Sequence, residues 1–252
     1  MSLQACAEIT RRGDPERFLA AMAAPPPARA VLFPLYAFNV EVARAPWVTS
    51  EPALAGIRLQ WWHDVLEEIA TGAPVSPHEV SVPLAGVLDG PGARALQGLV
   101  AARRHDIEGA PFADTAELLH YLGQTGGTLM WVAARALGCG QGEGAVRAVG
   151  RAAALAGWFR AVPTLLARGR HPLPDARPEA LSRLALAELD SLRAARRAVP
   201  APARPATRAG WLAGPVLRRA AARPERILSG GLEPSDFVKR GSLLWRTLAG
   251  RG

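Results

Sequence analysis

Cysteine is scarce in this chain of 252 residues, and its two cysteines, Cys6 and Cys139, stand far apart. Two isolated cysteines provide neither a disulfide framework nor the close spacing of a metal site. A chain without disulfides is typical of a reducing compartment, so we expect a cytoplasmic protein. Aromatic residues make up only 6% of the chain, and β-branched residues are sparse beside alanine, leucine and arginine. This composition favours helices over β-sheet.

Long apolar segments are also missing. The most apolar stretch, residues 152–167, is interrupted by Arg160, so we predict no transmembrane helix. The first residues, MSLQACAEITRRG, lack the apolar core of a signal peptide. The sequence contains no nucleic-acid-binding motif, and aromatic residues do not alternate with the basic ones. We therefore predict a cytoplasmic location, with peripheral attachment to the inner membrane as the alternative, and no nucleic-acid partner.

Lysine is nearly absent, and the charge is unevenly spread. Residues 1–150 hold 11 arginines and 15 acidic residues, a net charge of −4. Residues 151–252 hold 18 arginines, Lys239 and 7 acidic residues, a net charge of +12. A basic surface attracts nucleic acid, anionic lipid or an acidic protein. Without a nucleic-acid motif, we expect a membrane surface or a protein partner, and a salt-sensitive attraction of the C-terminal part to anionic membranes.

Helical signals occur along the whole chain. Capping patterns stand at Asp14-Pro15-Glu16 and at residues 114–117, where each predicts a helix start. Gly126-Gly127 lies inside a long predicted helix, where glycines often allow a second helix to approach closely. We expect about eight to ten helices in one all-α domain spanning residues 1–252. Within it, the proline-rich segment 199–207 is expected to be a flexible or polyproline connector.

Two neighbouring helices are predicted to organise this domain. The first, residues 28–44, is apolar on all sides and is expected in its centre, where Asn39 and Glu41 need partners. The second ends near Gly72 and carries an apolar arc of Leu54, Ile57, Trp61, Trp62, Val65, Leu66 and Ile69. Arg58 lies within that arc. We expect Arg58 and Glu41 to be buried, and close enough to pair or to share a water molecule.

Several short patterns together resemble the squalene/phytoene synthase family. They are Tyr36-Ala37-Phe38, the helix of residues 59–68, Asp106-Ile107, residues 121–127, Arg160, Arg168-Gly169-Arg170 and Leu173-Pro174. The resemblance spans residues 14–175 and fades beyond residue 178. It implies the all-helical isoprenoid synthase fold, with the helices that carry Tyr36 and Arg160 facing each other across the centre of the domain.

The enzymes of this family hold Mg²⁺ on two aspartate-rich helical segments, because the metal neutralises the diphosphate that leaves the substrate. When this sequence is laid on those segments, the first set of carboxylates falls at Ala43, Arg44 and Trp47, and the second at Ala161 and Leu165. The resemblance therefore implies no catalytic residue, no metal ligand and no cofactor. Mg²⁺ would be required only if other side chains had replaced the lost ligands.

Other acidic residues have simpler interpretations than metal binding. Glu41 is a single carboxylate in an apolar helix, where pairing with an arginine is expected. Asp64, Glu67 and Glu68 lie away from the apolar arc, on a face expected to be solvated. Asp106 is expected to form an ion pair with Arg103 near a helix end.

A second resemblance is narrower. The segments AFNVEVAR, SEP and IRLQWWHDVLEEI, between residues 37 and 69, are similar to the branch of the family that includes the mitochondrial complex I assembly factor. That branch also lacks the full aspartate motifs, and its members act in assembly of the respiratory NADH:quinone oxidoreductase. The likeness spans about the first two thirds of the chain.

Three functions are compatible with these observations. We prefer a non-catalytic assembly or binding factor for respiratory complex I, acting with a protein partner at the inner membrane. The alternatives are a binder of an isoprenoid or lipid, which needs only an apolar cavity with a few polar anchors, and a head-to-head prenyl transferase with rearranged ligands. The candidate cavity or anion-binding residues are Tyr36, Asn39, Glu41, Arg58, Trp62, Tyr121, Thr125, Arg160, Arg168 and Arg170.

Overall fold

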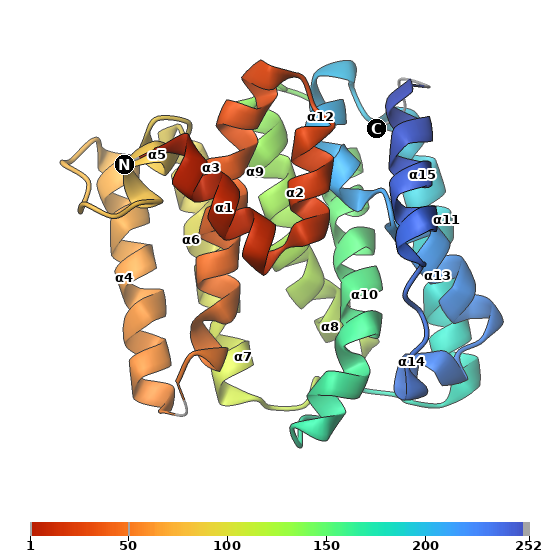
Figure 1. The fold of residues 1–252 in the computed structure, drawn as a ribbon. Coiled ribbons are helices and arrows are strands. Elements are labelled where there is room, and N and C mark those ends of the chain that lie inside the picture. The colour runs from red at the N-terminus through yellow and green to blue at the C-terminus, as the bar shows by residue number, and fades with distance from the viewer. Residues whose placement is uncertain (1, 50, 249–252) are drawn as a thin grey trace.

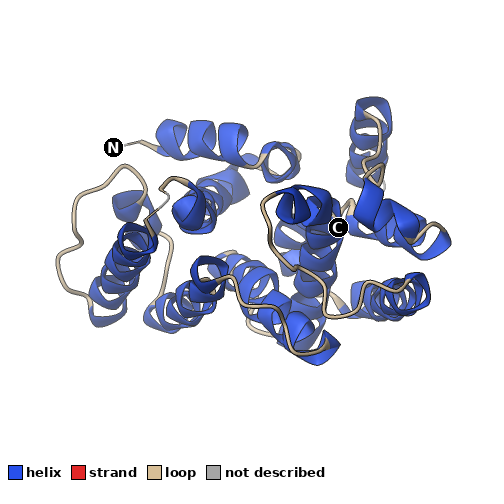
Figure 2. Cartoon of the chain, turned by 90° about the horizontal axis from the view of Figure 1, so that it is seen from below, coloured by secondary structure: helices blue, strands red, loops and turns tan. Residues whose placement is uncertain are grey.

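The computed structural model describes residues 2–49 and 51–248, and these residues form helices joined by turns, with no strand among them. Figure 1 shows the helices as an upright bundle with α4 at one edge and α11 and α15 at the other. Seen from below, all of the regular structure is helical (Figure 2). The expected all-α class is confirmed.

The N-terminal part contains α1 (Leu3–Gly13), α2 (Pro15–Met22), α3 (Pro26–Arg44), the 3₁₀ turn η1 (Ala45–Trp47) and α4 (Pro52–Thr71). The middle part contains α5 (Ser81–Ala85), α6 (Gly90–Ala102), α7 (Arg104–Glu108), α8 (Thr115–Leu122), the π-helical turn η2 (Gly123–Gly127), α9 (Thr128–Ala136) and α10 (Glu143–Ala167).

The C-terminal part contains α11 (Pro178–Ala198), η3 (Ala201–Ala203), α12 (Arg204–Thr207), η4 (Arg208–Gly210), α13 (Ala213–Ala222), α14 (Glu225–Ser229) and α15 (Asp236–Leu248). The described segments outnumber the eight to ten helices expected, because α5, α7, α12 and α14 are each only a turn or so long. The sequence pattern predicts a last helix near residues 234–249, of which residue 249 lies outside the described residues.

Helix α3 occupies the centre of the N-terminal part, as its apolar sequence predicts. Every residue from Leu32 to Val42 is buried, and α1, α2, α5 and α9 pack around the helix. Pro34 lies inside the helix and does not end it. Asn39 and Glu41 are buried with the apolar residues, so the expected burial of Glu41 is confirmed. Its partner is Arg44, whose Nη2 lies 3.1 Å from Glu41 Oε1.

The expected burial of Arg58 is wrong. The buried stripe of α4 runs through Ala55, Leu59, Trp62 and Leu66, at helical spacings of four, three and four residues. Leu54, Ile57 and Arg58 lie outside this stripe and are exposed. Helix α4 carries more apolar residues than can be buried against α6, its main neighbour. The sequence pattern therefore predicts a wider buried face than the one that forms, and Arg58 lies in the part that stays exposed.

The prediction of a flexible or polyproline connector at residues 199–207 is also wrong. This segment forms η3 and α12, and Ala203, Ala206 and Thr207 are buried in it, against α9. Each short helix has a proline within its first two positions, where the missing N–H of proline costs nothing. Alanines between the prolines then favour helix over an extended chain.

The glycines at 126 and 127 bring η2 into close contact with α10, as their sequence context predicts. A Cβ atom built on Gly150 of α10 would lie 2.5 Å from the carbonyl oxygen of Gly126 and 2.8 Å from Cα of Gly127. These distances are shorter than any van der Waals contact, so the two backbones touch directly. The crossing fixes the position of α10 relative to α8 and α9, which matters because α10 lines the cleft described below.

We predict that Gly150→Ala lowers the free energy of unfolding by about 1–3 kcal/mol, because the added methyl must push η2 away from α10. Gly157→Ala, in the same helix, is the matched control. A Cβ at Gly157 meets nothing within 4 Å. That substitution should leave stability unchanged or raise it by up to about 1 kcal/mol, since alanine favours helix. Urea unfolding of both variants measures this, and equal effects would contradict the close crossing.

Candidate functional site

A cleft runs between α3 on one side and α10 on the other. Two cavities of about 490 and 240 Å³ lie between these helices, and a third of about 720 Å³ adjoins them on the side of α1 and α2; Arg103 lines all three. The 490 Å³ cavity is lined by both Asn39 of α3 and Arg160 of α10. The 240 Å³ cavity is lined by both Ala43 of α3 and Ala161 of α10. The expectation that these two helices face each other across the centre is therefore confirmed.

The 240 Å³ cavity has mostly apolar and aromatic walls. Phe112 and Trp158 lie edge to face with ring centroids 5.8 Å apart, and the Trp158 indole N–H donates to the carbonyl oxygen of Pro172 at 2.9 Å. Leu165 continues the wall beyond Ala161. Three positions to which the family resemblance assigned carboxylates, Ala43, Ala161 and Leu165, thus meet at one cavity and present apolar side chains to it.

A polar triad stands where the cavities join. Arg103 Nη1 donates to Asp106 Oδ2 at 3.0 Å and to the Tyr121 hydroxyl at 2.8 Å. The Tyr121 hydroxyl donates to Asp106 Oδ1 at 2.7 Å. Burial raises the pKa of Tyr121 above its usual range, and Asp106 adds to this effect, so the hydroxyl stays protonated. The predicted Arg103–Asp106 ion pair is confirmed, and Tyr121, a predicted site residue, completes it.

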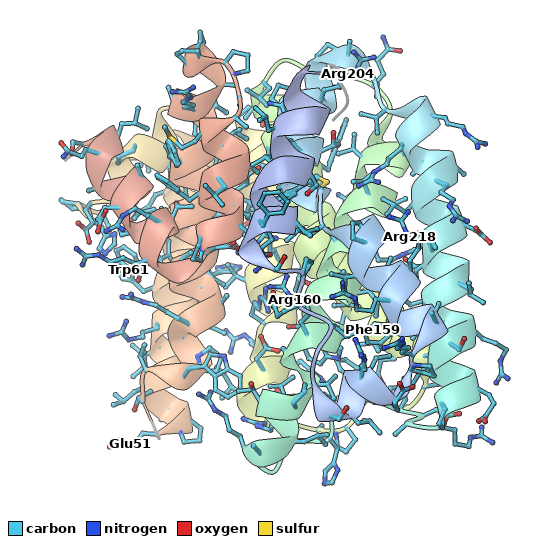
Figure 3. The ribbon with its side chains drawn as sticks, turned by 45° about the vertical axis from the view of Figure 1, so that its right-hand side comes forward. Glu51, Trp61, Phe159, Arg160, Arg204 and Arg218 are labelled. Carbon is cyan, nitrogen blue, oxygen red and sulfur yellow. The ribbon has the colours of Figure 1, made fainter. Side chains whose placement is uncertain are left out.

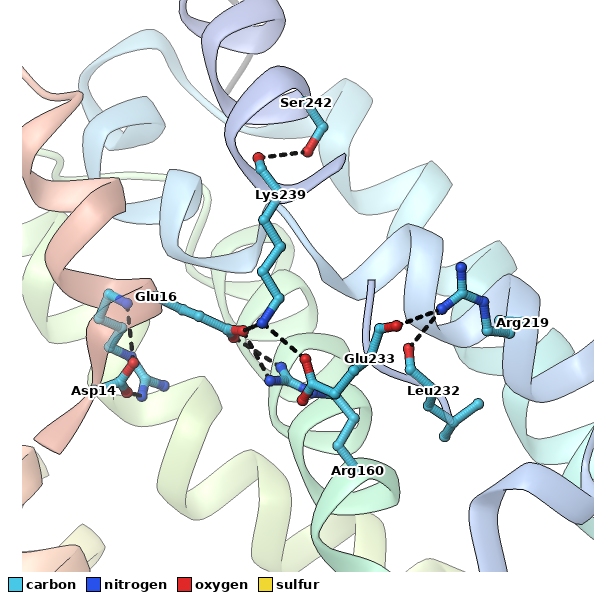
Figure 4. Close-up of polar contacts among 9 residues, drawn as sticks. Asp14, Glu16, Arg160, Arg219, Leu232, Glu233, Lys239 and Ser242 are labelled. Carbon is cyan, nitrogen blue, oxygen red and sulfur yellow. Dashed lines mark hydrogen bonds and ion pairs between the residues drawn. The ribbon is translucent and has the colours of Figure 1, made fainter. Parts of the chain in front are cut away.

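Arg160 is the centre of a second polar cluster. Its Nη1 and Nη2 donate to the two carboxylate oxygens of Glu16 in α2, both at 2.8 Å, and its Nε donates to Glu233. Lys239 of α15 lies between the same two acids, 3.0 Å from Glu16 Oε1 and 2.8 Å from Glu233 Oε2. Figure 4 shows these four side chains, two cations and two carboxylates, converging from four parts of the chain.

Burial alone would raise the pKa of Glu16, but the hydrogen bonds and charges of Arg160 and Lys239 outweigh it and hold that pKa below its usual value. The pKa of Arg160 is raised, because its two carboxylate partners outweigh the desolvation that would lower it. Arg160 is therefore a cation that already has its counter-ions. While Glu16 and Glu233 stay in place, it has no unpaired charge to offer a further anion.

Trp47, at the end of η1, meets two arginines from the segment that follows α10. The guanidinium carbon of Arg168 lies 4.8 Å from the centroid of the Trp47 ring, and that of Arg170 lies 5.8 Å from it. Arg170 also donates to the backbone carbonyl oxygen of Asp106 at 3.2 Å. Its guanidinium covers Gly109, where a Cβ would come within 1.2 Å of Nη1. Arg170 thus joins the ends of α3, α7 and α10.

The structure brings together some of the predicted site residues and not others. Those that line the cleft are Asn39, Glu41, Tyr121, Thr125, Arg160 and Arg170. Arg168 lies beside them on Trp47. Tyr36 is buried in the core, Trp62 packs edge to face on Phe38 and His78, and Arg58 is exposed, so these three lie outside the cavity lining described above.

Sequence reasoning missed the acidic partners of Arg160. Glu16 is separated from Arg160 by 144 positions and Glu233 by 73, and no local pattern connects them. Lys239 and Glu233 also lie in the part of the chain beyond residue 178, where the family resemblance fades. Arg103 could have been found, because it is paired with Asp106 at helical spacing, but its place at the junction of the cavities depends on the fold.

We predict that Glu16→Gln lowers the free energy of unfolding at neutral pH by about 1–3 kcal/mol, between the values for exposed and buried ion pairs. The folded-state pKa of Glu16 is lower than the ordinary value of 4.5, so its stabilisation is complete above that value and is lost as the pH falls through the folded-state pKa. The difference between wild type and variant should therefore shrink on acidification.

Urea unfolding of both proteins over a pH series measures that difference. Glu108→Gln is the control, since Glu108 is exposed and has no ion pair within the described residues. Its effect should stay within about 0.5 kcal/mol at every pH. A difference for Glu16→Gln that did not change with pH would show that the carboxylate charge is not what stabilises the cluster.

Comparison with known proteins agrees with the fold. A family model described as squalene/phytoene synthase matches residues 10–232. Two solved structures are similar in shape. One is a dehydrosqualene synthase in complex with ligand, with a TM-score of 0.76, 14% identity and coverage of 98% of this chain and 95% of that one. The other is squalene synthase HpnC from Alicyclobacillus acidocaldarius, with a TM-score of 0.68, 16% identity and coverage of 89% and 94%. The expected isoprenoid-synthase-like fold is confirmed.

The curated proteins that resemble this chain in sequence are named as assembly factors, whereas the similar solved structures are synthases. The chain is 28% identical over 163 residues to NADH dehydrogenase (ubiquinone) complex I, assembly factor 6 of Homo sapiens, over 63% of this chain and 48% of that protein. It is 27% identical over 174 residues to the protein of the same name from Bos taurus, over 67% and 52%. The chain spans about half the length of the curated relatives it matches. Both resemblances seen in the sequence are confirmed.

Proposed function

Because the chain belongs to the squalene/phytoene synthase family, we propose that it keeps the family's helical fold and serves as a non-catalytic factor in the assembly of respiratory complex I. The relatives named as complex I assembly factor 6 support this proposal. The observation that carries it is the 240 Å³ cavity between α3 and α10, where Ala43, Ala161 and Leu165 meet in place of facing carboxylates.

A prenyl transferase of this family must neutralise the diphosphate that leaves its substrate, and Mg²⁺ held by carboxylates supplies that charge. Two acids that line the cleft, Asp106 and Glu16, do not suit the task. Asp106 is engaged by Arg103 and Tyr121, and Glu16 by Arg160 and Lys239. Among the described residues, no group of three or more His, Cys, Asp or Glu side chains could hold a metal ion. The donor set therefore does not fit a magnesium–diphosphate cluster.

An assembly factor needs a protein partner, and we propose one in complex I or its assembly intermediates at the inner membrane. No helix in the described part of the chain is long and apolar enough to cross a bilayer. We propose a cytoplasmic protein that attaches peripherally to the membrane. The proposal requires neither Mg²⁺ nor any other cofactor.

A second function is favoured by one observation. The space between α3 and α10 is open, and Trp47, Phe112 and Trp158 give part of it an aromatic lining. A cavity of this kind suits an apolar chain, with Arg103 and Arg170 of its lining as polar anchors and the Tyr121 hydroxyl bound to Arg103 behind them. Binding of an isoprenoid or lipid without turnover is compatible with the assembly role and would be seen as ligand carried through purification.

The assembly role is tested by deleting the gene that encodes this chain. We expect the amount of assembled complex I, measured on native gels with NADH–quinone reductase activity, to fall, while squalene- and phytoene-type products stay unchanged. Re-expression of the wild-type chain should restore the complex. Loss of isoprenoid products with normal complex I would reverse the conclusion and assign the protein to prenyl transfer.

We predict that the purified protein does not release diphosphate from farnesyl or geranylgeranyl diphosphate, with or without Mg²⁺. Removing a single preorganised group that stabilises developing charge costs roughly 10²–10³ in rate, and here the facing carboxylates are all replaced. Diphosphate release is the measurement, because binding alone would not distinguish an enzyme from a binder.

Two variants make this assay decisive. Glu41→Gln and Asp106→Asn each remove a carboxylate of the cleft that could act as a replacement ligand. Release that depends on Mg²⁺ in the wild type and disappears in either variant would establish a prenyl transferase with rearranged ligands and end the non-catalytic proposal.

A further inference from the structure

One end of the bundle exposes an unusual number of large apolar side chains. They come from η1 and the residue after it, the start of α4 and the end of α10. They are Trp47, Val48, Leu54, Ile57 and Leu166, of which Ile57 is the most exposed at 63% and Trp47 the least at 40%. Single exposed apolar residues are ordinary, but a group of five in three adjoining segments is typical of an interaction surface.

These segments lie together at the same end of the molecule. Trp47 is covered by Arg168, which stands two residues after Leu166. The 3₁₀ turn η1, which contains Trp47, packs against α4, which contains Leu54 and Ile57. In Figure 1 the turn between α3 and α4, the short helix α7 and the C-terminal end of α10 all lie at the lower end, and Figure 3 labels Glu51 at the foot of α4. We call this surface the Trp47 end.

Cations surround the apolar residues of the Trp47 end and are not neutralised. Arg58 and Arg168 are exposed, and within the described residues neither forms an ion pair. Arg170 contacts the backbone carbonyl oxygen of Asp106 and the Trp47 ring, and it has no carboxylate partner in the described part of the chain. The exposed acids at this end, Glu51 and Glu108, are fewer than the arginines. By contrast, Arg160 inside the cleft has two carboxylate partners.

We propose that the Trp47 end is a docking surface for an anionic lipid bilayer. Exposed aliphatic side chains can enter the boundary between headgroups and acyl chains, tryptophan prefers that boundary, and arginines attract anionic headgroups. The Arg168–Trp47 stack suits this position, since it holds a cation and an amphipathic ring side by side. Because the arginines of this surface have no carboxylate partners among the described residues, we expect it to bind a bilayer that contains anionic lipid.

Docking in this orientation has a consequence for the cleft. Trp47 and Arg170 also line the 240 Å³ cavity, together with Leu165. The mouth of the aromatic cavity would then face the lipid, so an apolar chain could pass between the bilayer and the cavity without crossing water. The inference does not rest on the assembly role, because it concerns the membrane contact of the isolated protein.

The first test is co-flotation of the full chain with vesicles of phosphatidylcholine alone or of phosphatidylcholine mixed with phosphatidylglycerol. We expect binding to the anionic vesicles only, weakened by salt. The double variant Arg58→Gln/Arg168→Gln should bind them about 10-fold more weakly or worse. Both residues are exposed, so folding should be unaffected, which circular dichroism and thermal unfolding check.

The control is Arg218→Gln/Arg223→Gln, which removes two exposed arginines, one within α13 and one just beyond its end. Neither has an ion pair within the described residues. This variant should bind nearly as well as wild type. Equal losses in the two double variants would show that only the general positive charge of the C-terminal part attracts the membrane, and would overturn the proposal.

The second test measures which side of the protein enters the lipid. A polarity-sensitive fluorophore is attached at Val48→Cys, with Leu186→Cys on α11 as a control of similar exposure. The native Cys6 and Cys139 are buried, and burial raises the pKa of the Cys6 thiol to about 11, so labelling should be confined to the introduced cysteine.

We expect a blue shift and higher emission at position 48, and no change at position 186, when anionic vesicles are added. No response at position 48, an equal response at both positions, or equal binding to neutral vesicles would overturn bilayer docking. Each of these outcomes would indicate that the Trp47 end contacts a protein partner and not a bilayer.

Discussion

The neutralisation of buried charge determines what the cleft of this protein can do. Its walls carry several ionisable side chains, and a charge removed from water must find a partner or be neutralised. Here the partners are within the chain. Arg103 forms an ion pair with Asp106, Arg160 with Glu16 and Glu233, and Glu41 with Arg44. The acids of these pairs are therefore bound to guanidinium groups of the same chain.

The Arg160 cluster also connects distant parts of the fold. Glu16 comes from α2, Lys239 from α15, and Glu233 from the segment before α15, so α2 and α15 are both held to the C-terminal part of α10. The contact of η2 with Gly150 fixes the same helix nearer its N-terminus by direct backbone packing. The shape of the cleft depends on these two constraints, one electrostatic and one steric, and both act on α10.

Much of the fold could be predicted, because its signals are local. The central position of α3 follows from a helix with no polar side, and the helix starts at Asp14 and Asp114 follow from their capping side chains. The site was predicted only in part. Tyr121, Thr125 and Arg160 line the cleft, whereas Arg58 is exposed, because α4 has more apolar residues than its neighbours cover.

The sequence by itself determined the helical class, the family and the apolar residues at positions 43, 161 and 165, since all three are properties of local residue identity and spacing. The tertiary structure decided which charged side chains form ion pairs and which apolar residues of α4 are buried. It also decided which end of the bundle exposes Trp47 beside Arg168. Helical periodicity shows which side chains share a face of one helix. It carries no information about which face of another helix, over a hundred residues away, packs against it.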